Sequence, residues 1–422
     1  MATVKPFKAV YYNSDKVKDF SKVVAPPYDI ISDEEQTRLH NLSSYNFTHI
    51  DYAKDKSGDN KENNKYIRAK KIFQDWLKKG VMVQGEEPGI YFYRQQYKVM
   101  GQRYNRLGFI ALMELKDDGE SKVRPHENTH AKAVDDRLRL TRALSANLSP
   151  IFVCYSDKQR KVEKTFNRHV VSQKPMIDVT DKDGVHHQLW ALTDPALIKE
   201  ISQSLNGQNL FIADGHHRYK VATEYRKARL TRRQHIAGTE PFNYVMTYFT
   251  NIDAKDLQIF SMHRIVKRLP KKLDFIDDYF RIDKLKNKEE LLILLAKAGL
   301  NEHAFGLYTK EGTFLLRLKN KTLINKMVKE GSKDYKSLDA TILKSFIFDR
   351  IGLESSDIIY TKDFNQTIDM VDSGEAEASF ILNPVKISQL KAIALNGERM
   401  PPKTTYFYPK LLSGLTVYQM QE

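Results

Sequence analysis

The sequence contains a single cysteine, Cys154, among its 422 residues. One cysteine excludes an intrachain disulfide and any zinc site built from several cysteines. No run of about 18 uncharged apolar residues occurs, which excludes a helix that spans a bilayer. Residues 1–20 alternate charged and apolar side chains and lack the apolar core of a secretion signal. We therefore expect a cytoplasmic protein without a membrane partner.

Apolar and basic residues are plentiful. Hydrophobic residues make up 41% of the chain and aromatic residues 11%, which is enough for a sizeable core and excludes disorder of the whole chain. The formal net charge of +15 suits a nucleic-acid binder, but it suits an enzyme for phosphorylated substrates equally well. Acidic and apolar residues interrupt the basic clusters, so we do not expect nucleic acid to be the main partner.

The first part of the chain mixes strand and helix patterns. Residues 90–99 and 104–115 are rich in aromatic and branched side chains around Met100-Gly101, which predicts a long hairpin. Residues 135–146 have helical spacing, and residues 151–155 predict a buried strand. A capping box formed by Ser32 and Glu35 predicts the start of an earlier helix.

The pattern changes character after about residue 252. A charged stretch at 272–299 is interpreted as helical, residues 304–318 as a hairpin, and three further helices are expected at 338–351, 364–371 and 387–395. Mixed strands and helices with antiparallel hairpins predict an α+β protein. We expect a first domain at 1–252 and a second α+β domain at 253–422 that contributes to or closes the site.

The most informative segment spans residues 212–219, where an apolar strand ends at Asp214-Gly215 and a helix starts at once. Backbone N–H groups at a helix N-terminus form an anion site. His216, His217 and Arg218 add side-chain donors, and arginine can hold phosphate oxygens with two parallel hydrogen bonds. Gly215 carries no Cβ that would block a close approach to the backbone. The segment therefore predicts a phosphate-binding turn.

A second segment, Arg124-Pro125-His126-Glu127, places a carboxylate in a loop that proline stiffens. A glutamate near bound phosphates would accept the proton of an attacking hydroxyl. Taken alone, a His-Glu pair in a loop is more often simply exposed to solvent.

Residues 124–127 followed by Asp214-Gly215-His216-His217-Arg218 resemble the ParB/sulfiredoxin superfamily, and within it the ParB-like free serine kinases. The resemblance implies a ParB/sulfiredoxin-like core with a mixed sheet and long hairpins. It also implies transfer of a phosphoryl group from ADP or ATP, with Mg²⁺, to free L-serine. Glu127, His126 and Asp214 would be catalytic, with Asp214 near the metal and the nucleotide. Residues 215–218 would hold the phosphates.

The residues of the turn also distinguish this chain from other subgroups of that superfamily. Sulfiredoxins carry a catalytic cysteine where this chain has His216, so sulfinic acid reduction is disfavoured. Over its whole length the chain resembles a prokaryotic family of domain-of-unknown-function proteins. The shared segments lie at residues 25–29, 126–129, 136–140, 147–152, 214–218, 263–264 and 400–410.

Other candidates have weaker support. Lys403 lies in a proline-stiffened loop and would reach a phosphate, as would Arg137, while Asp29 and Arg264 are candidate contacts to the substrate. Lys410 is a further basic residue of that loop. Each of these residues has an alternative role in a turn, in a cap or on a solvated surface.

The sequence thus predicts a phosphotransferase that moves a phosphoryl group from a nucleoside phosphate to a small hydroxyl compound, most simply free serine. One alternative is a phosphoserine phosphatase that uses the same anion site. Another is a non-catalytic, ParB-like nucleotide-binding regulator that binds DNA through the basic helix ending at Arg232-Arg233. The pattern leaves the choice between ADP and ATP open, as well as the oligomeric state.

Overall fold

The structure is a computed structural model that describes residues 3–117, 119–231 and 238–420, so Arg232 and Arg233 lie outside the described part. The chain divides into two compact units. Unit 1 comprises residues 1–125, 129–257 and 409–422, and unit 2 comprises residues 126–128 and 258–408. This division differs from a single boundary near residue 252, because a short loop and the C-terminal segment each leave the unit that precedes them in sequence.

Unit 1 is built on a nine-stranded mixed sheet in the order β6-β11-β8-β12-β5-β4-β10-β9, with β1 paired to β5. The pairs β6–β11 and β8–β12 are parallel and the other pairs are antiparallel. These strands are β1 (Val4–Lys5), β4 (Ile90–Val99), β5 (Gln102–Glu114), β6 (Val123–Arg124), β8 (Ile151–Tyr155), β9 (Ile177–Thr180), β10 (His186–Leu192), β11 (Leu210–Asp214) and β12 (Tyr244–Asn251). Two short ribbons add β2 (Val10–Tyr12) with β3 (Met82–Gln84), and β7 (Ala146–Asn147) with β21 (Tyr418–Gln419).

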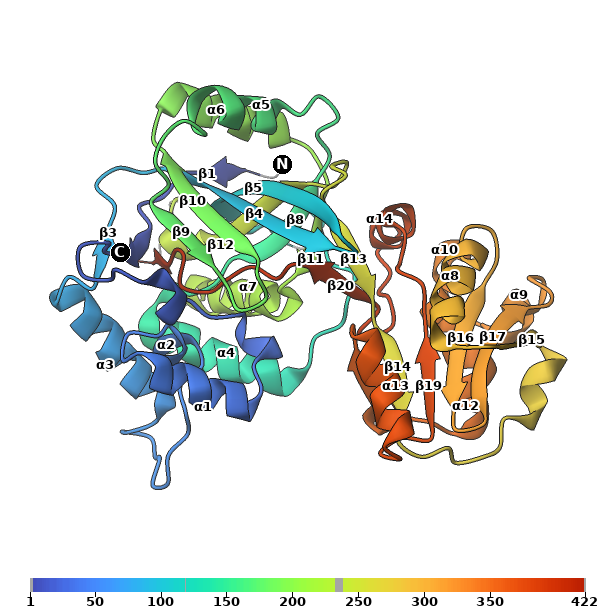
Figure 1. The fold of residues 1–422 in the computed structure, drawn as a ribbon. Helices are drawn as coiled ribbons and strands as arrows, with labels where there is room; N and C mark the ends of the chain where they lie inside the picture. The colour runs from blue at the N-terminus through green and yellow to red at the C-terminus, as the bar shows by residue number, and fades with distance from the viewer. Residues whose placement is uncertain (1–2, 118, 232–237, 421–422) are drawn as a thin grey trace. The chain divides into compact units, whose positions relative to one another are not determined.

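Helices cover this sheet (Figure 1), with α5 and α6 on one side of it and α7 and α4 on the other. Local sequence signals place several helix starts: Ser32 accepts a hydrogen bond from the Glu35 backbone N–H, and Asp194 caps a helix that begins with Pro195. The helices are α1 (Asp33–Leu42), α2 (Thr48–Asp51), α3 (Lys65–Lys78), α4 (Ala131–Leu144), α5 (Lys161–His169), α6 (Pro195–Leu205) and α7 (His216–Leu230), with short turns η1 (Phe20–Lys22), η2 (Tyr28–Ile30) and η3 (Pro241–Asn243).

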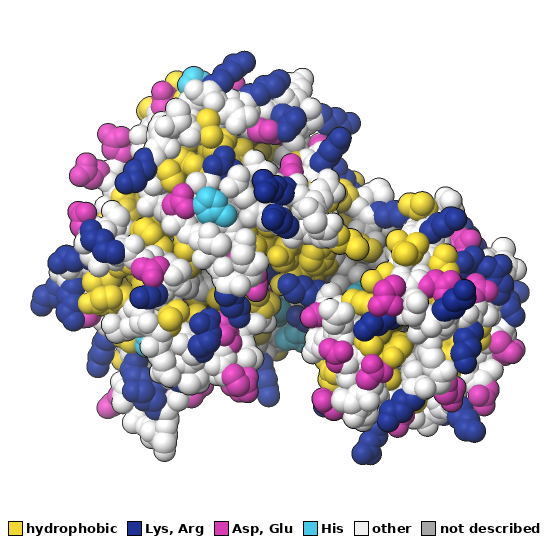
Figure 2. All heavy atoms as spheres, viewed as in Figure 1, with side chains coloured by type: hydrophobic (Ala, Val, Ile, Leu, Met, Phe, Trp, Pro, Cys, Tyr) yellow, Lys and Arg dark blue, Asp and Glu magenta, His cyan; other side chains and the backbone are white. Residues whose placement is uncertain are grey.

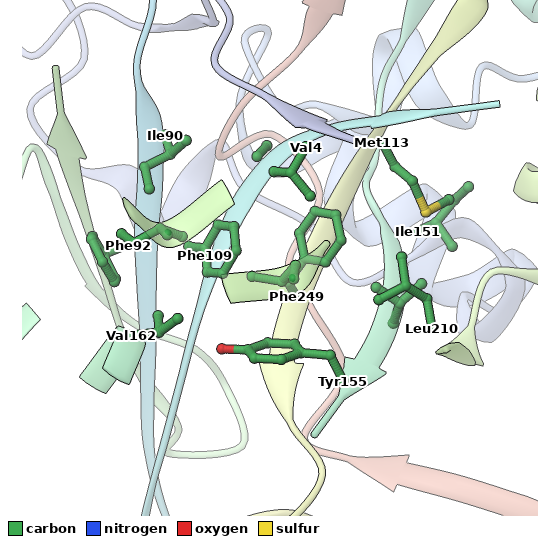
Figure 3. Packing of buried hydrophobic residues seen from close by; sticks show 14 of the residues in the cluster. Val4, Ile90, Phe92, Phe109, Met113, Ile151, Tyr155, Val162, Leu210 and Phe249 are labelled. Carbon is green, nitrogen blue, oxygen red and sulfur yellow. The ribbon is translucent and has the colours of Figure 1, made fainter. Parts of the chain in front are cut away.

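Aromatic and branched side chains from the sheet form the core of unit 1 (Figure 3). Phe109 of β5 and Phe249 of β12 stack with ring centroids 5.1 Å apart. Phe92 of β4 packs against Phe166 of α5, with centroids 5.2 Å apart. Cys154 is buried in β8, as expected for a core residue. This packing fixes the strands whose ends carry the candidate site.

Unit 2 contains a six-stranded sheet in the order β15-β17-β16-β19-β14-β18, in which every pair is antiparallel. Its strands are β14 (His263–Val266), β15 (Phe280–Leu285), β16 (Ala304–Thr309), β17 (Gly312–Leu318), β18 (Ile358–Thr361) and β19 (Ala378–Ile381), and β13 (Gln258–Ser261) forms a separate ribbon with β20 (Thr405–Tyr408). The helical segments are η4 (Asp274–Asp278), α8 (Lys288–Ala298), α9 (Leu323–Met327), α10 (Lys333–Lys336), α11 (Asp339–Leu343), η5 (Lys344–Phe348), α12 (Asp349–Ile351), η6 (Ser355–Asp357), α13 (Phe364–Asp372) and α14 (Ile387–Leu395).

The α+β class, the mixed sheet and the long hairpins are confirmed. The interpretation of residues 272–299 as one charged helix is wrong, because Phe280–Leu285 forms edge strand β15 and only Lys288–Ala298 is an α-helix. The charged residues suggested a helix, but β15 is an edge strand in which only Phe280 is buried, and charged residues are common at a sheet edge. Among the described residues, no helix is long and apolar enough to cross a membrane.

Basic side chains are spread over the surface of the described residues (Figure 2), where Lys and Arg alternate with Asp and Glu on the face shown. That face carries no continuous basic stripe of the kind that tracks a nucleic-acid backbone. The distribution agrees with the interrupted charge clusters of the sequence.

Candidate functional site

The turn between β11 and α7 has a backbone that only glycine adopts easily. The pairing of β11 with β8 shifts register between Ile212 and Asp214, and Gly215 follows with a φ of 84°. A Cβ at Gly215 would lie 2.9 Å from Nε of Arg218, because that guanidinium group covers the glycine. Helix α7 then begins at His216 without a side-chain cap. The N–H groups of a first helical turn point outward along the axis, so the turn has the geometry of an anion site.

Asp214 lies between two cations at the end of β11. Its Oδ1 accepts a hydrogen bond from Nζ of Lys410 at 2.6 Å, and its Oδ2 accepts one from Arg218 at 2.8 Å. The Arg218 guanidinium also donates to the carbonyl of Pro150. Burial raises the pKa of the Asp214 carboxyl, but Lys410 and Arg218 lower it by more, so the net pKa is well below the usual range. The carboxylate is therefore ionised at neutral pH.

Lys410 reaches Asp214 because buried side chains bind the backbone on both sides of it. Gln95 donates to the Lys410 carbonyl at 2.8 Å, and Arg106 donates to the Pro409 carbonyl at 2.5 Å. The Leu412 N–H donates to the Tyr93 hydroxyl at 3.4 Å. Sequence reasoning noted Lys410 only as a basic residue. Its pairing with Asp214, 196 positions away, had no local signal.

The two histidines of the turn differ in environment. His216 is buried with 6% exposure. Nε2 of His217 accepts the backbone N–H of His130 at 3.0 Å, and the two rings stack with centroids 5.9 Å apart. An accepting Nε2 fixes the tautomer, so the proton of a neutral His217 ring is on Nδ1.

A narrow pocket lies beside this turn within unit 1, and its lining includes Tyr28, Asp51, Arg137, Ser149 and Arg218. Arg137 is buried among carboxylates: it donates to Asp136 at 2.6 Å and to Asp51 at 3.3 Å. Its guanidinium also lies 4.2 Å from the centre of the Tyr28 ring. The sequence analysis included Ser149 only within the shared segment 147–152 and did not single out Asp51, which lies at the end of the short helix α2 without a local motif.

Asp29, the candidate substrate ligand, is exposed in the short turn η2. It directly follows Tyr28, whose ring lines the pocket of unit 1. The structure thus places Asp29 at the surface near this pocket.

The loop with His126 and Glu127 is anchored to unit 1 at both ends. Before it, β6 pairs in parallel with β11, and Nε of Arg124 donates to the Asn209 side chain at 3.1 Å. After it, His130 bonds to His217 as described above. The flank before the loop therefore lies beside β11, and the flank after it contacts the first turn of α7.

Residues 126–128 themselves belong to unit 2. The His126 carbonyl accepts the Met400 N–H at 2.7 Å, and Nε2 of His126 lies 3.4 Å from the Thr405 hydroxyl. Oε1 of Glu127 accepts the backbone N–H of Lys403 at 3.3 Å. The loop around Met400 to Thr405 thus holds both predicted catalytic side chains in place.

Lys403 and Arg264 continue this second cluster. Lys403 is exposed, with a φ of 53°, and its carbonyl accepts a hydrogen bond from Arg264 at 3.4 Å. Arg264 is buried in β14 with 4% exposure. The predicted residues therefore form two groups, with Asp29, Arg137 and 214–218 in unit 1 and His126, Glu127, Arg264 and Lys403 in unit 2.

A metal role for Asp214 was also predicted. Each of its oxygens already faces a cation, Lys410 or Arg218, which is a poor environment for Mg²⁺. Among the described residues, no group of three His, Cys, Asp or Glu side chains is placed to hold a metal ion. As arranged, the residues do not fit a protein-bound Mg²⁺.

The chain belongs to the DUF1015 family of proteins of unknown function, whose model matches residues 4–341. This confirms the resemblance to a domain-of-unknown-function family over residues 4–341. None of the curated proteins matches the chain in sequence.

Several solved structures are similar at low identity. A conserved hypothetical protein from Pyrococcus furiosus shares 13% identity with a TM-score of 0.34, and the match covers 71% of this chain and 92% of that protein. A free serine kinase in complex with AMP shares 14% identity with a TM-score of 0.33, covering 68% and 83% of the two chains. C-terminally truncated SbnI from Staphylococcus aureus shares 11% identity with a TM-score of 0.38, covering 73% and 87%.

Proposed function

We propose that this member of the DUF1015 family is a phosphotransferase that moves a phosphoryl group from ADP or ATP to the hydroxyl of a small metabolite, with free L-serine as the first candidate. The observation that carries the proposal is the turn between β11 and α7. There an uncapped helix N-terminus coincides with His216, His217 and Arg218, and Lys410 adds a second cation beside Asp214.

Phosphoryl transfer depends mainly on positioning and on neutralising charge, and both properties suit this turn. The helix N-terminus and its basic side chains would hold the phosphate oxygens of the nucleotide. The Asp214 carboxylate would keep Arg218 and Lys410 oriented. Arg137 and Lys403 are further proposed phosphate contacts, while Asp29 and Arg264 are proposed contacts to the acceptor.

Glu127 is the proposed base, and His126 is proposed to act beside it. The acceptor hydroxyl oxygen forms a bond to the terminal phosphorus as the bond from that phosphorus to the bridging oxygen breaks. The hydroxyl proton passes to the Glu127 carboxylate, and the nucleotide leaves with one phosphate fewer. The described residues do not fit a bound Mg²⁺, so each of these roles belongs to a side chain of the protein.

The test is nucleotide turnover by the full chain with and without L-serine, using ADP and ATP separately. Serine-dependent turnover with formation of phosphoserine supports the proposal, and Glu127→Gln should lower it by about 10²–10⁴-fold. The matched control is Glu120→Gln, an exposed glutamate that should leave turnover unchanged.

Absence of serine-dependent turnover with both nucleotides would reject serine as the acceptor. Release of phosphate from phosphoserine without any nucleotide would point instead to a phosphatase. Nucleotide binding without turnover, together with DNA affinity that falls steeply with salt, would indicate the non-catalytic alternative.

A further inference from the structure

Arg264 is a buried cation whose guanidinium lacks a carboxylate. It donates to the carbonyl groups of Met262 and Lys403 and lies 5.5 Å from the centre of the Tyr360 ring. Within residues 3–117, 119–231 and 238–420, no Asp or Glu forms an ion pair with it. A guanidinium offers five N–H donors, so two carbonyl partners leave donors that can bind a further group.

Such an arrangement is costly in a folded protein. Arginine does not lose its proton under ordinary conditions, so a buried guanidinium retains its charge and has to be paired or solvated. Burial also lowers the pKa of Arg264 to about 10, because removal from water disfavours the charged form of the side chain. The neighbouring His263 does not balance the positive charge of Arg264. Burial lowers the pKa of His263 to about 4, so its ring is neutral at pH 7.

Arg264 also lines a pocket that lies entirely in unit 2. The empty space there is about 300 Å³, open solvent included. Polar side chains on its wall include Thr404, Asn383 and Gln389. The carboxylate in the lining, Asp339, hydrogen-bonds His303 at 2.8 Å. The pocket thus combines the Arg264 cation with neutral polar groups, and the one carboxylate of its lining pairs with His303 and not with Arg264.

We propose that Arg264 binds an anionic oxygen group, the carboxylate or phosphate of a small ligand, in this pocket of unit 2. The anion supplies the charge that the protein leaves out, with hydrogen bonds from the remaining guanidinium donors. Only the identification of this ligand with the acceptor substrate rests on the proposed function. The binding of an anion does not.

The experiment measures ligand-dependent thermal stabilisation and calorimetric affinity of the full chain without nucleotide. The probes are inorganic phosphate, L-serine, and ethanolamine, which has the hydroxyl and amine of serine but no carboxylate. The variants are Arg264→Gln and a matched control, Arg350→Gln, an exposed arginine that also stacks on aromatic rings, Phe275 and Tyr279. Arg218→Gln weakens the proposed phosphate site of unit 1.

We expect Arg264→Gln to weaken binding of at least one anion about 10- to 100-fold, as for loss of a charge-assisted hydrogen bond. Arg350→Gln should bind like the wild type. A carboxylate ligand predicts that serine stabilises the protein and ethanolamine does not. A phosphate ligand predicts stabilisation by phosphate that persists in Arg218→Gln.

Equal anion affinity in the wild type and Arg264→Gln overturns the proposal, as does a wild type that binds none of the probes. If Arg264→Gln fails to fold, Arg264→Lys replaces it and should bind more weakly while unfolding normally. A purely structural arginine would lower the unliganded stability and leave the affinity unchanged, which also overturns the proposal. Because no nucleotide is present, missing kinase activity leaves these results intact.

Discussion

Arg137 and Arg264 are both buried arginines packed on a tyrosine ring, but their surroundings differ in charge. Arg137, in unit 1, contacts the carboxylates of Asp51 and Asp136. Arg264, in unit 2, has carbonyl partners and no ion pair among the described residues. Carboxylates of the protein balance the charge of Arg137. For Arg264 we propose that a bound anion provides the balancing charge. Burial alone therefore does not distinguish a structural arginine from a binding one.

The strongest test of this difference is Arg137→Met. Removal of one partner of a buried ion pair leaves the other charges uncompensated, so we expect a loss of about 3–5 kcal/mol in the free energy of unfolding, measured by urea denaturation. The control is Arg139→Met on the same helix, whose ion pair with Asp135 is exposed. That change should stay within about 0.5 kcal/mol. Equal losses would remove the basis of the comparison.

Lys410→Met tests whether the ion pair between Lys410 and Asp214 stabilises unit 1, as the ion pairs of Arg137 are expected to do. Loss of this charge-assisted hydrogen bond should cost about 1.5–3 kcal/mol at pH 7. The lowered pKa of Asp214 contributes stability above its unfolded value of about 3.9, and this contribution is lost as the pH falls through the folded value. The variant raises the folded pKa, so its stability should depend less on pH in the acid range.

The measurement for Lys410→Met is the free energy of unfolding between pH 3 and 7. Lys79→Met is the control, since its ion pair with Asp75 is exposed. An unchanged pH profile in Lys410→Met would mean that Arg218 alone holds the carboxylate.

Gly215→Ala tests whether Arg218 is held over the turn. The positive φ costs a residue with a Cβ about 1–2 kcal/mol, and the new methyl group would also displace the guanidinium. Gly207→Ala has a similar φ of 74° but no atom within 4 Å of the new Cβ, so it reports the backbone strain alone. The difference between the two variants in thermal unfolding measures the contact. No difference would show that Arg218 moves without cost.

The smallest effect is expected for Arg264→Met without ligand. A buried charge that lacks a partner stabilises little, so the unfolding free energy should change by less than about 1 kcal/mol or rise. A loss comparable to that of Arg137→Met would instead make Arg264 a structural residue. Chemical denaturation of both variants under the same conditions gives the answer.

Local sequence patterns predicted those helices and strands well in which the apolar spacing and the turn residues indicate the same structure. The hairpin at 90–115, strand β8 and helices α7 and α14 form close to their expected positions, because their apolar spacing and turn residues agree with the packing. Residues 280–285 were misassigned because only Phe280 is buried and three of the six residues are charged, so they lack the pattern of a half-buried strand. Strand β8 is shorter, but all five of its residues are buried, and its apolar run could be recognised.

The site residues show a different limit. The turn at Asp214 was identified because its chemistry lies in adjacent residues. The partnership with Lys410 and the pocket residue Asp51 come from segments far apart in sequence, and the burial of Arg264 depends on two neighbouring strands. Such contacts arise only when the sheets are assembled, so no single stretch of sequence encodes them.

The return of residues 409–422 to unit 1 has a consequence for synthesis. A ribosome produces residues 258–408 before it produces the segment that carries Lys410 and β21. Unit 1 therefore lacks its C-terminal segment until all of unit 2 has been synthesised. Asp214 gains its lysine late, so a chain that stops short of residue 409 would carry the Asp214 turn in a half-neutralised form. Because of the order of translation, this segment reaches the Asp214 turn, the proposed phosphate site, only late in synthesis.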